Sequence, residues 1–192
     1  YGFNRMVQKS ELRELLEMGL ISGVLNYVNV KKGDCIFVPA GTVHSIGSGI
    51  LAYEVQQPSD LTYRIYDWNR TDSCGKGREL HIDKALDAIN YSSGLPCVIN
   101  VYDSLEDGIF NIIECEYFAL SFRVINKEEY HFYEPGKFRA ITAVSGNLLL
   151  RYEDFQLSVK KGDTCIIPEE YDREVRVEGL GAAEYIVAAG SN

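Results

Sequence analysis

Val30-Lys-Lys-Gly-Asp-Cys-Ile-Phe-Val-Pro39 occurs a second time in the chain, with few changes, as Val159-Lys-Lys-Gly-Asp-Thr-Cys-Ile-Ile-Pro168. The first five residues are identical, and the apolar run and the proline follow at the same positions in both copies. Gly-Asp is typical of a hairpin turn, the apolar residues of a strand buried on both faces, and the proline of the end of that strand. A β-unit that occurs twice predicts two similar β-domains in tandem.

The rest of the chain consists mainly of short β-rich runs that are broken by Gly, Pro, Asn and Asp. Helix signals are few. We expect a helix that is capped by Ser10 and ends near Gly19, a shorter helical turn that ends by Tyr27, and a third helix over residues 81–89. The turn-rich residues 91–96 predict a domain boundary, with a first domain over residues 1–92 and a second over residues 93–192.

Composition and charge exclude several classes of function. The 192 residues carry a formal net charge of -9, which argues against nucleic acid, since nucleic acid is held by Lys and Arg. One or two positioned cations would still suffice for a small anion. No apolar run is long enough to cross a bilayer, so we expect no membrane partner and a cytoplasmic protein. The chain begins with Tyr1 rather than Met, and we expect it to be a fragment.

A histidine follows the first copy at a defined spacing, Gly33-x5-Pro39-x-Gly41-x2-His44. This spacing is similar to the second conserved motif of the cupin family, the double-sheet β-barrels of the jelly-roll type. The resemblance implies a mainly β fold: double-stranded β-helix (cupin/jelly-roll) barrels in tandem, the first incomplete, with a few short helices. It also implies that His44 is a metal ligand. Arg173 stands at the equivalent position of the second copy, so a second cupin-like barrel without the metal motif is expected.

Residues 49–68 and 78–81 sharpen the resemblance. They contain Tyr-Glu54-Val-Gln-Gln-Pro-Ser-Asp60-Leu-Thr-Tyr-Arg64 and are similar to the signature of type I mannose-6-phosphate isomerases in their short bacterial form, C-terminal portion. That resemblance implies a zinc-dependent enzyme that interconverts mannose 6-phosphate and fructose 6-phosphate, a small-molecule hexose phosphate, through a cis-enediol.

The same resemblance assigns roles within the site. His44 is the zinc ligand that lies within this chain, and the family's Gln-x-His pair and Glu lie upstream of Tyr1. The family's active-site arginine corresponds to Arg64. Domain 1–92 is then the C-terminal part of the metal-binding cupin domain. Because its other zinc ligands are absent, the fragment itself is expected to bind Zn²⁺ weakly and to be almost inactive.

The residues themselves lead to a compatible hypothesis. Alternation over residues 61–66 places Arg64 on a polar strand face in register with Asp60, and alternation over residues 51–57 places Glu54 on another. Inside a barrel such polar faces are costly unless they build a site. Glu54 and Asp60 are therefore candidate proton carriers or groups that orient others. The alternative is a structural ion pair of Arg64 with Asp60 or Glu54.

The sequence also allows other roles for the remaining histidines and two alternative functions for the chain. His81 is expected to be a solvated or capping residue and His131 a strand residue. A metal-free tandem cupin that binds or senses sugar is the main alternative function. A cupin oxygenase with another metal is a third, although such enzymes usually have a nearby two-histidine motif and the first 32 residues contain no His.

Overall fold

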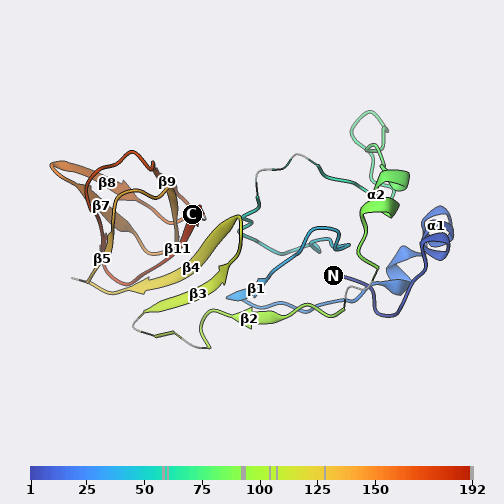
Figure 1. Ribbon diagram of the computed structural model, residues 1–192, viewed down its shortest axis with the longest axis horizontal. Coiled ribbons are helices and arrows are strands. Elements are labelled where there is room, and N and C mark those ends of the chain that lie inside the picture. The colour runs from blue at the N-terminus through green and yellow to red at the C-terminus, as the bar shows by residue number, and fades with distance from the viewer. Residues whose placement is uncertain are drawn as a thin grey trace. The chain divides into compact units, whose positions relative to one another are not determined.

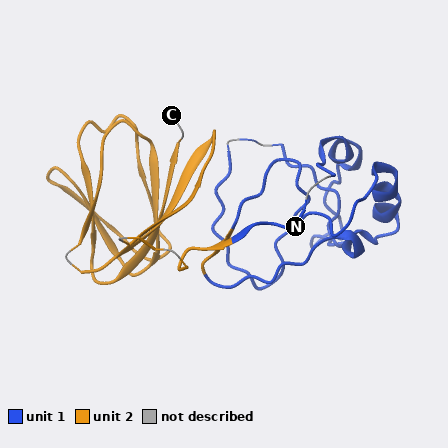
Figure 2. Cartoon of the chain, turned by 60° about the horizontal axis from the view of Figure 1, so that its bottom comes forward, with its two compact units in different colours: residues 1–32, 36–98 blue, residues 33–35, 99–192 orange. Residues whose placement is uncertain are grey.

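The computed structural model describes residues 1–57, 59, 61–91, 94–103, 105–106, 108–127 and 129–190. The chain forms two compact units, residues 1–32 with 36–98 and residues 33–35 with 99–192 (Figures 1 and 2). Ser92 and Ser93, at the expected domain boundary, lie outside the described residues, and the division into 1–92 and 93–192 stays a prediction. Within the described part of the chain, no helix is long and apolar enough to cross a membrane.

Unit 1 is built around three short helices, α1 (Lys9–Glu17), the 3-10 helix η1 (Ile21–Val24) and α2 (Ile82–Ala88). Leu12 and Leu16 lie one turn apart on α1, so their side chains share the face that is buried. They pack with apolar residues from both ends of the unit: Phe3, Val7, Ile21, Val24 and Leu86. The helices expected near residues 10–19 and over 81–89 are thereby confirmed.

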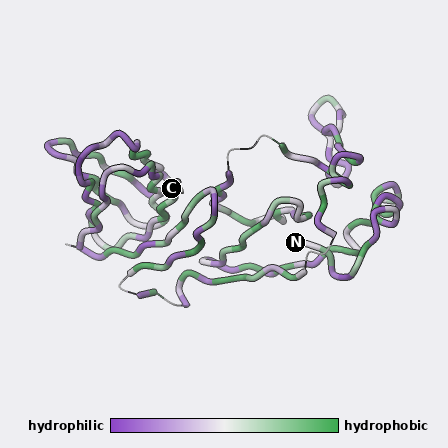
Figure 3. Tube along the Cα trace, viewed as in Figure 1, coloured by the Kyte–Doolittle hydropathy of each residue, from purple (hydrophilic) through white to green (hydrophobic). Residues whose placement is uncertain are grey.

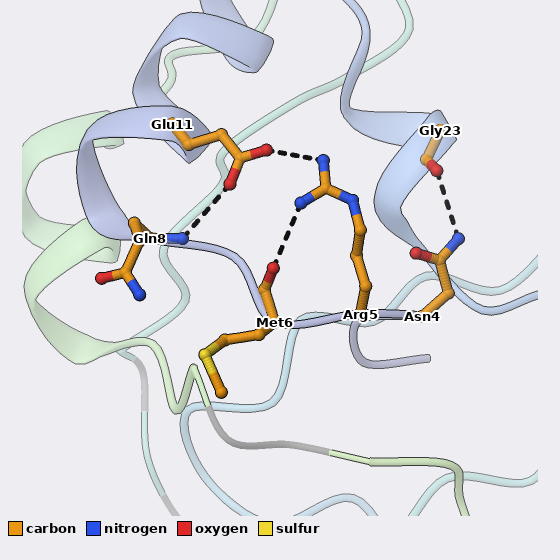
Figure 4. Close-up of polar contacts among 6 residues, drawn as sticks. All are labelled: Asn4, Arg5, Met6, Gln8, Glu11 and Gly23. Carbon is orange, nitrogen blue, oxygen red and sulfur yellow. Dashed lines mark hydrogen bonds and ion pairs between the residues drawn. The ribbon is translucent and has the colours of Figure 1, made fainter.

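The N-terminus of α1 differs from its prediction, because Gln8 rather than Ser10 is the capping residue. Glu11 reaches back toward the Gln8 N–H, with its Oε2 3.5 Å from that nitrogen. Its other oxygen accepts a hydrogen bond of 2.6 Å from Arg5, whose guanidinium also donates to the Met6 carbonyl (Figure 4). The cap expected at Ser10 is therefore replaced by a Gln-x-x-Glu pair that begins two residues earlier.

Residues 51–57 and 61–66 do not form the two strands predicted from their alternation, because the structure assigns no β-pairing to any described residue between 37 and 66. A strand needs ladder partners for its backbone groups, and the described part of unit 1 supplies none beside these segments. Two of their apolar side chains are largely exposed, Leu51 to 101% and Leu61 to 72%, whereas Ile65 packs against the core of unit 1. Because these segments are not part of a sheet, they do not present the separate polar and apolar faces that were predicted.

Unit 2 contains two antiparallel sheets of described strands, ordered β5-β10-β7-β8 and β3-β4-β11-β6-β9. The bounds of these strands are β3 (Ile109–Glu114), β4 (Phe118–Ile125), β5 (Tyr130–Tyr133), β6 (Arg139–Ser145), β7 (Leu148–Tyr152), β8 (Phe155–Val159), β9 (Thr164–Ile167), β10 (Val175–Gly179) and β11 (Ala183–Gly190). Hydrophobic and hydrophilic residues are interspersed along them (Figure 3), as strands with one buried face require. Alternate residues such as Val175 and Val177 of β10 and Ala183, Tyr185 and Val187 of β11 form the core.

The two repeat copies share their turn but not their sheet. Gly33 and Gly162 have φ angles of +88° and +91°, a left-handed conformation that glycine adopts without a steric penalty. After the turn, β9 joins the five-stranded sheet, whereas β1 (Asp34–Ile36) pairs with β2 (Val98–Asn100) in a two-stranded one. The strand is also not buried on both faces as expected. Because β9 is an antiparallel strand with one face toward the core, Ile167 is buried and Ile166 is 58% exposed.

Gly146, in the turn between β6 and β7, should be the glycine of unit 2 that tolerates alanine least. Its φ is +70°, and an added Cβ would lie 2.3 Å from the Ala182 carbonyl oxygen, which belongs to the backbone and cannot swing aside. At Gly162 the φ is also positive, but nothing lies within 4 Å of the added atom. Both substitutions should cost the left-handed penalty of about 1–2 kcal/mol. Gly146→Ala should cost about 1–3 kcal/mol more.

Denaturant unfolding of the two variants beside the parent chain measures this difference. Equal destabilisation by Gly146→Ala and Gly162→Ala would contradict the close backbone approach at the β6–β7 turn.

Candidate active site

His44 lies in a loop that the backbone holds at several points. The Gly41 carbonyl accepts a hydrogen bond of 2.9 Å from the Asn90 N–H, and the Val43 carbonyl accepts one of 2.7 Å from the Gly2 N–H. At Gly41, whose φ is +82°, an added Cβ would lie 2.7 Å from the Ala88 carbonyl oxygen at the end of α2. The glycine of the motif is therefore required for the close packing of this loop against α2, which fixes the position of His44 two residues beyond Thr42.

The imidazole of His44 is oriented by its own loop. Its Nδ1 lies 2.8 Å from the Thr42 carbonyl oxygen, and because a carbonyl only accepts, Nδ1 carries the proton of this hydrogen bond. In the neutral ring the lone pair then lies on Nε2, which has no hydrogen-bond partner among the described residues. A histidine that donates one ring N–H to a carbonyl and has the other nitrogen free has the arrangement of a metal ligand.

Arg64 is positioned through its backbone. Its N–H donates to His81 Nδ1 at 3.3 Å, and its carbonyl accepts a hydrogen bond of 2.7 Å from the His81 N–H. His81 is the residue that precedes α2, so the prediction of a capping position for it is confirmed, with its ring turned to Arg64 rather than to the helix. Both bonds use main-chain groups of Arg64, which leaves its guanidinium without a partner among the residues that the structure describes.

The predicted site residues that the structure describes are His44, Glu54 and Arg64. No hydrogen bond or ion pair joins His44, Glu54 and Arg64 in the described part of the chain, and Glu54 is exposed. The structural ion pair of Arg64 with Glu54 is therefore not formed here. Asp60, the other candidate partner and proton carrier, lies outside the described residues.

A cluster around Asp67 was not predicted from the sequence. Asp67 is only 7% exposed, and its Oδ1 accepts a hydrogen bond of 2.8 Å from Arg70. The Arg78 Nε lies 3.4 Å from the Oδ2 atom, close enough for an ion pair, although Oδ2 receives no hydrogen bond. Trp68 and Asn69 between them have φ angles of +48° and +51°, so this ion-pair cluster folds the chain into a left-handed turn directly after Arg64. The i,i+3 spacing of Asp67 and Arg70 was the available signal.

In unit 2, Arg173 stands where the repeat predicts the counterpart of His44. It is exposed and forms an ion pair of 2.5 Å with Glu153. His131 lies on β5, as predicted for a strand residue. Its ring Nδ1 is hydrogen-bonded to the Tyr185 hydroxyl on β11. Within the described residues of both units, no group of three or more His, Cys, Asp or Glu side chains is placed to hold a metal ion.

The sandwich of antiparallel sheets in unit 2 and the spacing that ends in His44 define a cupin-type protein. Residues 108–188 match the family model of the mannose-6-phosphate isomerase cupin domain. The mannose-6-phosphate isomerase ManA of Bacillus subtilis is 38% identical over 191 residues, which are 98% of this chain and 58% of that protein. The mannose-6-phosphate isomerase of Streptococcus mutans is 31% identical over 164 residues, 83% of this chain and 50% of that protein.

A solved structure agrees with these sequence relationships. The crystal structure of the mannose 6-phosphate isomerase from Bacillus subtilis superposes with a TM-score of 0.81 at 33% identity, over 97% of this chain and 58% of that one. The chain belongs to the mannose-6-phosphate isomerase family of cupin proteins. It spans between 50% and 58% of the length of the curated relatives that it matches.

Proposed function

We propose that this chain is part of an aldose–ketose isomerase that interconverts mannose 6-phosphate and fructose 6-phosphate. The observation that carries the proposal is the 38% identity to the Bacillus subtilis isomerase over nearly the whole chain. The positions of unit 1 would then belong to a first cupin barrel that residues outside this chain complete, with unit 2 as the second. The left-handed turn shared by Gly33 and Gly162 supports this tandem arrangement.

The chemistry of the reaction suggests roles for the site residues. A base takes a proton from one of the two carbons C1 and C2 and returns it to the other, and negative charge develops on the oxygens of the enediol. Arg64 would stabilise that charge or bind the phosphate, because its guanidinium forms no ion pair with a described carboxylate. Glu54 and Asp60 are the proposed proton carriers, or they orient the groups that carry protons.

His44 would hold the zinc ion of the family by its Nε2, and the hydrogen bond from Nδ1 to the Thr42 carbonyl fits this role. Zinc bound there would act as a Lewis acid on the substrate oxygens. A catalytic zinc site has three protein ligands, and the described residues contain no such group around His44. We therefore propose that the remaining ligands lie outside this chain.

The isomerase activity is tested on the protein encoded by the complete reading frame that contains this chain. Zinc-loaded protein is mixed with mannose 6-phosphate, and the formation of fructose 6-phosphate is followed beside the Bacillus subtilis isomerase as a positive control. Conversion that is lost in His44→Ala is the expected result. Saturable binding of mannose 6-phosphate without conversion would contradict the proposal and would favour a sugar-binding module instead.

A further inference from the structure

The sandwich of unit 2 is not filled along its whole length. A cavity of about 500 Å³ lies among residues of β3, β4, β5, β6 and β11, and its volume is in the range of small-molecule sites. It has no residue in common with unit 1, where His44, Glu54 and Arg64 lie. It also does not coincide with the motif that led to the isomerase proposal, so it calls for a separate explanation.

The cavity arises because the inward faces of two strands change from apolar to polar along their length. On β4, Ile125 packs in the core, and the residues two and four positions earlier, Arg123 and Ser121, line the cavity. On β6, Ile141 packs in the core and Arg139 lines the cavity. Placing polar groups on an inward strand face is unfavourable in a purely structural sandwich, and such groups point to a binding site.

Two groups of the cavity lining, His131 and Tyr133, belong to a chain of neutral hydrogen-bonding groups that spans the two sheets. The Tyr185 hydroxyl on β11 is hydrogen-bonded to His131 Nδ1 and lies 3.3 Å from the Tyr133 hydroxyl on β5. Burial raises the pKa of both tyrosines, so both hydroxyls retain their protons. Burial, and then the positive charge of Arg123, lowers the pKa of His131, an effect that Glu129 opposes. His131 and Tyr133 therefore offer the cavity polar atoms without negative charge, and the buried Tyr185 hydroxyl links the two.

Neither arginine of the cavity forms an ion pair with a carboxylate in the described part of the chain, although the charge of Glu134 acts on Arg139. The Nε of Arg123 donates to the Ser121 hydroxyl at 3.2 Å, and its terminal nitrogens have no described partner. Arg139 donates to the carbonyls of Glu134 and Lys137 at 2.8 and 3.3 Å, and its guanidinium lies 5.3 Å from the centre of the Tyr133 ring. Both positive charges act on the Tyr133 hydroxyl, which places them around the same group of the lining.

The charge balance of the cavity is opposite to that of the chain. Its lining contains three cations, Arg123, Lys137 and Arg139, and one carboxylate, Glu114, for a net charge of +2, whereas the chain as a whole carries -9. A guanidinium binds a carboxylate or phosphate with two parallel hydrogen bonds, and a partly buried one does so with little competition from water. The lining thus selects for negative charge where the protein otherwise repels it.

We propose that this cavity binds a small organic oxyanion, whose carboxylate or phosphate is held by Arg123 and Arg139 and whose hydroxyl groups are hydrogen-bonded by Tyr133 and His131. The site is separate from the proposed isomerase centre and does not depend on zinc. In a tandem protein whose second barrel has Arg173 in place of the ligand His44, it gives that barrel a binding role of its own.

Isothermal titration of the 192-residue chain with citrate and with fructose 6-phosphate tests the proposal. Saturable binding of one or both probes at a single site is expected, and Arg123→Gln and Arg139→Gln should each weaken it by about tenfold or more. Arg173→Gln is the matched control. It removes the same charge from an exposed ion pair of unit 2 that does not line the cavity, and it should leave the affinity within about twofold.

A second substitution guards against a loss of binding through misfolding. Asn111 is exposed at the cavity, so Asn111→Asp should fold normally and still weaken binding of either anion by charge repulsion. Binding of citrate alone identifies a carboxylate ligand and binding of fructose 6-phosphate alone a phosphate ligand. The proposal is overturned if neither probe binds, if affinity survives in Arg123→Gln, Arg139→Gln and Asn111→Asp, or if it is lost only in Arg64→Ala, which would place the anion in unit 1.

Discussion

Replacing Arg64 by alanine in the complete protein is expected to lower the kcat of the proposed isomerase reaction by about 100- to 1,000-fold and to leave the free energy of unfolding almost unchanged. Removing one group that stabilises developing negative charge typically has an effect of this size. Stability should be preserved because the hydrogen bonds of Arg64 with His81 use main-chain atoms, which alanine retains. The measurements are steady-state kinetics and denaturant unfolding of the same preparations.

Arg70→Ala is the matched control, because it removes an arginine six residues away that donates a hydrogen bond to the buried Asp67. It should destabilise by about 1–3 kcal/mol, the cost of leaving a buried acceptor without its donor, and it should retain most of the turnover. Arg64→Lys should restore turnover only partly, since lysine has the charge but not the planar fork. Near-normal kcat in Arg64→Ala combined with a lower melting temperature would instead show that Arg64 has a structural role.

Zinc binding should differ sharply between this chain and the complete protein. The 192-residue chain is expected to bind Zn²⁺ weakly and to be almost inactive, while the complete protein should bind one zinc ion per subunit. The reason is the number of ligands, since a catalytic site needs three protein ligands and the described residues form no such group around His44. His44→Ala in the complete protein should reduce zinc affinity by more than the roughly 10- to 100-fold that follows from altering a hydrogen-bond partner of a ligand.

Metal content after dialysis and isomerase activity, measured side by side on both proteins, test this expectation. His131→Gln serves as the control because this histidine belongs to unit 2 and is engaged with Tyr185, so its loss should not change the zinc content. Tight binding of one zinc ion by the 192-residue chain, with turnover comparable to that of the complete protein, would mean that other residues of this chain form the site.

The sequence by itself determined the features that depend on neighbours along the chain. Gly33 and Gly162 share one turn conformation because the Lys-Lys-Gly-Asp segment needs a residue free to adopt a positive φ angle. The amphipathic spacing of Leu12 and Leu16 was sufficient to predict α1, and the spacing that ends in His44 led to the cupin class, to which the matching family model belongs. In each case the physical cause lies within about ten residues, and so it can be recognised without knowing the fold.

Tertiary structure alone decided which segments became strands and where the polar groups of unit 2 gather. Residues 51–57 and 61–66 alternate like strands, yet no described segment pairs with them, because pairing depends on segments distant in sequence. His131 was assigned to an ordinary strand, and only the packing of β5 against β11 brings it to Tyr185, 54 residues away, beside Arg123. Alternation predicts that such residues share a face, but the closing of two sheets over that face determines whether they enclose a core or a charged cavity.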